Sequence, residues 1–247
     1  MFVAASTRSF SDKSFAEATF QIDDLEYDKV ELWLDENQNQ LKPSEIVRDP
    51  DGFCTRYRES TRLTPVALCL ESDVSIEDFT VLSRVAKQLR VAQITLPASR
   101  LGTPFNSEID RLREFHKVAG QDGVLISIKT KTGHLTEDPD TAIELCQAVT
   151  GLGLTLDPSY YICGPHRGGN FDQVYPFVYH VHLRDTTPEQ LQVPVGLGEM
   201  DYARLISQLE RVKYNRALSV EILPELTDPA SRLIELRKMR LLLESLL

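Results

Sequence analysis

Four hydrophobic segments in the second half of the sequence each end in residues that could do chemistry. Lys129 ends LISIK, Asp157 follows LTL, and Glu221 lies in LSVEIL, while YHVHLRD carries His182 and then Arg184. Asp, Glu and His side chains suit a divalent cation such as Mn²⁺, Mg²⁺ or Zn²⁺. A lysine ammonium group does not coordinate a metal, because it has no free lone pair. The lysine at position 129 therefore decides whether the sequence predicts a metal site.

Two further ionisable side chains lie within apolar segments. Glu31 interrupts KVELWL, and a buried carboxylate needs a partner because its isolated burial is costly. His180 and His182 are two residues apart on one predicted strand, so both point to the same side of it. For Glu31, an ion pair inside the fold and a role in substrate binding are equally compatible with the sequence.

The remaining candidates are cations in loops that follow predicted strands. Arg8 and Arg167, together with Lys129 and Arg184, could form a cationic rim that binds a carboxylate or a phosphate. Single loop arginines are usually just solvated, and the two interpretations carry equal weight. Carboxylates at 35, 36, 71 and 73 should share the same face and would oppose an anionic ligand.

An alternation of strands and helices runs through the whole sequence. The predicted strands are residues 1–6, 29–34, 65–70, 91–96, 124–128, 153–156, 177–183 and 217–222. Capping motifs such as Ser14-x-x-Glu17 mark the starts of intervening helices, and the region 43–60 is a weaker helical segment broken near 49–52. Eight strand–helix units in 247 residues predict one (β/α)₈ TIM barrel over residues 1–247, with its active site at the carboxyl ends of the strands. An open doubly wound sheet is less favoured, because no phosphate-binding turn follows the first strand.

The composition limits the kinds of partner. A net charge of −10 opposes binding to nucleic acid or to an anionic membrane surface, and no segment is apolar for long enough to cross a bilayer. The four cysteines form no C-x-x-C pair, which is typical of reduced thiols in a cytoplasmic protein. The sequence leaves the oligomeric state open, a homo-oligomer included.

Several of these segments together resemble the xylose isomerase-like TIM barrels. The resemblance rests on STRSFSDKSFAEA, YDKVEL, LTLDPSYY, HVHLRD, GLGEMDYARLI and LSVEI in this order. That group contains sugar-phosphate isomerases and epimerases, ketose 3-epimerases and a DNA-repair endonuclease branch. The nuclease branch is disfavoured here, because it uses more metal ligands than this chain retains.

The resemblance implies a set of four metal ligands, one from each of strands five to eight. Asp157, His182 and Glu221 match the ligands of strands six, seven and eight, whereas Lys129 replaces the glutamate of strand five. That glutamate is also one of two that exchange a proton with the substrate in the epimerases. In the LDPSY segment, Tyr160 replaces a histidine that commonly contacts substrate. Both differences lie at the expected site of chemistry.

The charge of Lys129 leads to the main functional prediction. Asp157 and Glu221 should raise the pKa of the amine, so that it acts as a cation that balances the carboxylates rather than as a base. We therefore expect a sugar isomerase/epimerase-like protein with an altered metal site, no bound cofactor, and activity that is lost or diverted. The alternatives are an intact metal-dependent isomerase that uses the three remaining ligands, and a metal-free protein that binds a sugar, a sugar phosphate or a sugar acid.

Overall fold

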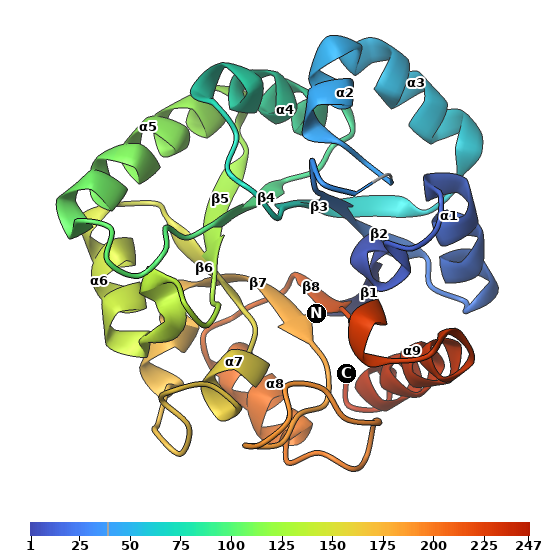
Figure 1. The fold of residues 1–247 in the computed structure, drawn as a ribbon, viewed down its shortest axis with the longest axis vertical. Helices are drawn as coiled ribbons and strands as arrows, with labels where there is room; N and C mark the ends of the chain where they lie inside the picture. Colours follow the sequence, from blue (N-terminus) through green and yellow to red (C-terminus); the bar gives the residue numbers. More distant parts are fainter. Residues whose placement is uncertain (39) are drawn as a thin grey trace.

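Eight parallel strands close into a barrel in sequence order, and a ring of helices surrounds it (Figure 1). The computed structural model describes residues 1–38 and 40–247. The strands are β1 Phe2–Ser6, β2 Lys29–Leu34, β3 Thr64–Leu70, β4 Gln93–Pro97, β5 Leu125–Lys129, β6 Gly153–Leu156, β7 Val178–Leu183 and β8 Ala217–Val220. The barrel closes where β1 pairs with β8, with Phe2 opposite Ala217. The predicted (β/α)₈ fold is confirmed.

The helices lie outside the barrel, between successive strands. They are α1 Phe15–Asp24, α2 Pro43–Arg48, α3 Pro50–Ser60, α4 Ile76–Gln88, α5 Phe105–Asp122, α6 Pro139–Ala148, α7 Ser159–Ile162, α8 Tyr202–Arg211 and α9 Pro229–Glu244. Short 3₁₀ turns follow β1 (η1, Thr7–Phe10) and β8 (η4, Pro224–Leu226). Among the described residues, no helix is both long and apolar enough to cross a membrane.

Local sequence signals explain where most of these helices begin. Ser14 and Glu17 form the predicted capping box of α1, each side chain bonding the other's backbone N–H. The weak helical region splits at Asp49, whose side chain caps α3 while Pro50 occupies its first turn. α5 ends at Gly123, which adopts the left-handed conformation (φ 71°) that glycine accepts most easily.

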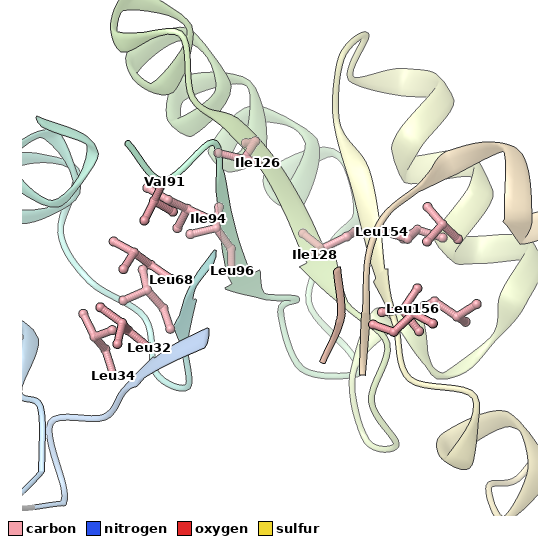
Figure 2. Packing of buried hydrophobic residues seen from close by; sticks show 14 of the residues in the cluster. Leu32, Leu34, Leu68, Val91, Ile94, Leu96, Ile126, Ile128, Leu154 and Leu156 are labelled. Carbon is pink, nitrogen blue, oxygen red and sulfur yellow. The ribbon is translucent and has the colours of Figure 1, made fainter. Parts of the chain in front are cut away.

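Strand alternation separates an apolar outer layer from a polar barrel interior. Ile126, Ile128, Leu154 and Leu156 are buried in the hydrophobic core of Figure 2. The alternate positions are polar: the Thr155 hydroxyl is hydrogen-bonded to those of Thr95 and Ser127, at 2.7 and 2.6 Å. Because side chains alternate along a strand, Lys129 shares the interior side with Ser127, and Asp157 shares it with Thr155. The strands thus direct charged residues into the mouth of the barrel.

Candidate active site

Three of the predicted ligands converge at the carboxyl ends of β6, β7 and β8. Asp157 and Glu221 directly follow their strands, and His182 lies one residue before the end of β7. One ligand atom from each lies within 4.8 Å of the other two, and all three side chains are fully buried. The convergence predicted from the strand ends is therefore confirmed.

Lys129 lies in the same cluster, paired with Glu221. Its Nζ donates to both carboxylate oxygens, at 3.0 and 3.1 Å, and the residue is buried. Burial opposes the charge on the amine, but the Glu221 carboxylate outweighs it, so the pKa of Lys129 is raised above its ordinary value. Lys129 thus contacts one of the two carboxylates that were expected to raise its pKa, and it is a poor proton acceptor in this state.

Arg184 also enters this cluster and contacts both carboxylates. Its Nη1 lies 2.8 Å from Asp157 Oδ2, in an ion pair whose angles do not make a hydrogen bond. The same Nη1 donates a hydrogen bond to Ser159 Oγ at 2.7 Å. Its Nη2 donates to Glu221, and its Nε donates to the Glu221 carbonyl at 3.1 Å. The guanidinium is thus held between Asp157 and Glu221, in the interior of the site.

The position of Arg184 corrects the predicted cationic rim. Lys129 and Arg184 are buried in ion pairs and do not face solvent. Arg167 is exposed in the loop after α7 and is not among the residues that line the pocket above Arg8. The sequence contained a signal for the inward position: 180, 182 and 184 are alternate residues, and the two histidines were already expected on one side.

The charges in this cluster stabilise one another. Burial favours the neutral acid of Glu221, but Lys129, His182 and the two arginines together hold the pKa of its carboxyl well below the ordinary value. Burial also opposes the charge of Arg184, yet Asp157 and Glu221 raise its pKa. The cluster is therefore an ionised network whose positive charges come from protein side chains.

Below this cluster, Glu31 binds two histidines. Its Oε2 lies 2.5 Å from His180 Nε2 and 2.7 Å from His182 Nε2. Although burial favours the neutral acid, the two imidazoles hold the pKa of the Glu31 carboxyl below its ordinary value. An ionised carboxylate oxygen can bind both rings only if each Nε2 carries a proton and donates it. Nδ1 of His182, on the other side of the ring, lies 3.8 Å from Glu221. Burial lowers the pKa of His180, so Glu31 is the charged acceptor of an internal hydrogen-bonded network with the two imidazoles.

The residues present do not fit the four-ligand metal site that the resemblance implies. Position 129 supplies a cation in place of a carboxylate, and both oxygens of Glu221 already accept from Lys129. Asp157 Oδ2 and His182 Nδ1 have no hydrogen bond among the described residues, but the Arg184 guanidinium occupies the space beside Asp157. A divalent ion would add two positive charges next to two existing ones, which a buried site of low dielectric constant disfavours.

The open part of the barrel mouth is a pocket of about 590 Å³ beside this cluster. Arg8, in η1, lines the pocket and lies 3.2 Å from Glu71, 3.5 Å from Glu221 and 3.7 Å from Glu225. Its guanidinium stacks on the Trp33 ring, whose Nε1 donates to Glu71 at 3.0 Å. Arg8 thus links the pocket to Glu221 of the buried cluster.

Tyr160, Trp33 and Glu71 complete the surroundings. Tyr160 is buried in α7, with the Arg184 guanidinium 5.6 Å from its ring centroid. Trp33 and Glu71 were not predicted to be binding residues. Glu71 directly follows β3, so its place after a strand was the available signal. Trp33 gave no signal, because an aromatic residue in an apolar strand is ordinarily part of the core.

The fold has many relatives of known structure. A probable 3-DHS dehydratase from Bacillus anthracis is 16% identical, with a TM-score of 0.74 and coverage of 99% of both chains. A xylose isomerase-like TIM barrel protein from Mycobacterium smegmatis, in complex with magnesium, is 17% identical with a TM-score of 0.77, covering 99% of this chain and 97% of that one. A D-allulose 3-epimerase from Methylomonas is 12% identical with a TM-score of 0.73, covering 100% and 98%. At these identities the likeness shows the fold alone.

Sequence comparison gives the family. No curated protein matches the chain. The sequence profile of the xylose isomerase-like TIM barrel matches residues 21–240, which is most of the chain. The order of the barrel strands and the placement of Asp157, His182 and Glu221 agree with the resemblance seen in the sequence. This chain belongs to the xylose isomerase-like TIM barrel family.

Proposed function

We propose that this protein is a sugar isomerase/epimerase-type barrel that has lost divalent-metal chemistry and keeps its mouth as a binding site for a small polyhydroxylated molecule. The observation that carries this proposal is the pair of cations on the residual ligand set. Lys129 binds both oxygens of Glu221, and Arg184 lies between Glu221 and Asp157. Together they supply the positive charge that a metal ion would bring.

The protonation states of Lys129 and Glu221 also disfavour catalysis of the epimerase type. Two bases on opposite faces of a substrate must exchange a proton, and each must be able to lose and accept one near neutral pH. The pKa of Lys129 is raised and that of Glu221 is strongly lowered, so the first stays protonated and the second stays ionised. Neither residue lines the pocket, and Arg8 lies between the pocket and Glu221.

The enzymes among the structurally similar proteins support a sugar-like ligand. They include a D-allulose 3-epimerase, a D-tagatose 3-epimerase-like protein and an L-ribulose 3-epimerase. The pocket of about 590 Å³ has room for a molecule of that size. Its lining offers carboxylates, a glutamine and a tryptophan, which suit the hydroxyl groups and C–H faces of a polyol.

Calorimetric titration with Mn²⁺ tests the loss of the metal site. Wild type should bind at least tenfold more weakly than Lys129→Glu, because this substitution restores the fourth ligand and changes the local charge by two units. Adding Arg184→Ala to Lys129→Glu should strengthen binding further, since the second cation is then removed. Lys117→Glu, at an exposed position on α5, makes the same change in net charge and should leave the affinity at the wild-type level.

Tight Mn²⁺ binding by the wild type would contradict the loss of the metal site. Tight binding of one Mn²⁺ per chain by the wild type, unchanged in Lys129→Glu, would show that the cations do not replace the ion. The three remaining ligands, Asp157, His182 and Glu221, would then suffice. In that case the intact metal-dependent isomerase or epimerase becomes the better description of the protein.

A further inference from the structure

The charges around the pocket determine what kind of ligand it can accept. Its titratable lining residues are four carboxylates and two arginines: Asp12, Asp35, Glu71, Glu225, Arg8 and Arg232. Negative charge therefore exceeds positive charge on the walls. The whole chain adds to this potential, because its net charge is −10.

Both arginines of the pocket are already paired. Arg232 is 2% exposed on its side chain and binds Asp12 in a two-pronged contact, at 2.9 and 3.0 Å. Arg8 is shared among Glu71, Glu221 and Glu225. An anionic ligand would have to break one of these ion pairs before it gained a contact, and it would leave a carboxylate uncompensated.

One carboxylate of the pocket wall has no cation beside it. Asp35 follows β2 and is 7% exposed, and its Oδ1 accepts from the backbone N and the side-chain Nδ2 of Asn37 at 3.2 and 3.3 Å. Among the described residues no ion pair is formed by Asp35, and no hydrogen bond reaches its Oδ2. Glu225, across the pocket, is 57% exposed on its side chain. Asp35 Oδ2 and the exposed Glu225 carboxylate can therefore accept from a ligand or from water.

We propose that the pocket selects a polyhydroxylated ligand that is neutral or carries an ammonium group, and that it rejects phosphates and carboxylates. This inference rests on the proposed function, and it narrows the ligand class of the same site. Hydroxyl and ammonium groups donate to Asp35 and Glu225, while Trp33, Pro224 and Pro229 supply the apolar part of the wall. The sugar phosphates and sugar acids expected from a cationic rim are thereby excluded.

Four probes on one six-carbon scaffold test the charge selectivity. They are D-glucosamine, D-glucose, D-gluconate and D-glucose 6-phosphate, compared by thermal shift and calorimetry at slightly acidic pH and constant ionic strength. Glucosamine should bind at least tenfold more tightly than gluconate, a difference of about 1.4 kcal/mol. Glucose should fall between them, and the phosphate should give no shift beyond that of inorganic phosphate.

A matched pair of variants locates the effect in the pocket. Asp35→Asn should reduce the preference for glucosamine over glucose at least tenfold. Asp73→Asn removes an exposed carboxylate after β3, which pairs with Arg111 at 3.2 Å and does not line the pocket, so it should leave the order of the probes unchanged. If gluconate or the phosphate equals or exceeds glucosamine, or if Asp35→Asn has no effect, the inference is wrong. The Mn²⁺ titration tests the loss of the metal site, and the four probes test the charge selectivity of the pocket. If the wild type shows no selectivity among the probes and also binds Mn²⁺ weakly, the inference is wrong but the proposed function stands.

Discussion

Replacing Lys129 by methionine removes the amine from a fully buried carboxylate. Methionine keeps the length and flexibility of the lysine stem, so the principal change is the loss of the two contacts to Glu221. Breaking a buried ion pair by removing one partner costs ~3–5 kcal/mol, because the other charge stays buried. Glu221 still has Arg184 and Arg8, so we expect a loss at the lower end, about 3 kcal/mol.

A double-mutant cycle separates the ion pair from general damage to the core. Glu221→Gln keeps the shape of the side chain and removes its charge, and the combination with Lys129→Met leaves Arg184 paired with Asp157. The double variant should be less destabilised than the sum of the two single variants by about 1.5 kcal/mol or more. Urea unfolding followed by circular dichroism measures all four proteins, and comparison of their m-values checks that the unfolded states match.

Exposed Lys117→Met provides the control, with an expected change within about 0.5 kcal/mol. If Lys129→Met were as stable as the wild type, the amine would contribute nothing to the cluster. If the loss of unfolding free energy in the double variant equalled the sum of the losses in the two single variants, Lys129 and Glu221 would not be coupled. Either result would refute the claim that the lysine balances the carboxylates in place of a metal ion.

Three further predictions concern the same part of the barrel. Glu31→Gln should destabilise the fold by about 2 kcal/mol, because two buried imidazoles lose their charged acceptor. If urea unfolding at neutral pH shows no change, the contacts of Glu31 with the two histidines do not stabilise the fold. Burial alone would raise the pKa of Glu71, but nearby cations lower it from 4.5 to about 2. The stabilisation that the ionised Glu71 gives the fold is therefore complete above pH 4.5 and is lost as the pH falls toward 2. Between these pH values, Glu71→Gln should lose less stability than the wild type in urea unfolding. Prolonged dialysis against a chelator should leave the melting temperature unchanged, and a fall restored by Mn²⁺ would show that a metal supports the native fold.

Most of the fold could be predicted from the sequence, because each element carries its own local signal. Alternation of strands with capped helices gave the eight strands and their order, and the strand ends placed Asp157, His182 and Glu221 together. Element ends were less certain: β8 stops at Val220, so Glu221 lies just beyond the strand rather than within it. Strand ends depend on pairing with neighbours, which a single sequence does not contain.

The candidate site was predicted less completely, since long side chains can reach in several directions. The strand ends predicted that Lys129 pairs with Asp157 or Glu221, and it pairs with Glu221. Arg184 was assigned to an outer rim and instead folds into the barrel. A guanidinium can point to solvent or inward at almost the same backbone position, and the number of buried carboxylates decides between them. Asp157 and Glu221 together carry more negative charge than one lysine balances, which favours the inward position.

The two proposals follow from this one distribution of charge. Arg184 and Lys129 neutralise the carboxylates inside the barrel, so neither cation remains at the mouth to receive an anionic ligand. Arg8 is the cation between the two regions, and Glu71, Glu221 and Glu225 all compete for it. Lys129→Glu would add a further carboxylate within reach of this network, and without added metal it would draw Arg8 toward the interior. The pocket should then become more acidic. Without Mn²⁺, this variant should therefore prefer glucosamine over gluconate more strongly than the wild type does. When Mn²⁺ is added, the preference should return toward the wild-type level. Calorimetry with both sugars, with and without the ion, measures this coupling; an identical preference in all four combinations would show that the interior charges and the pocket are independent.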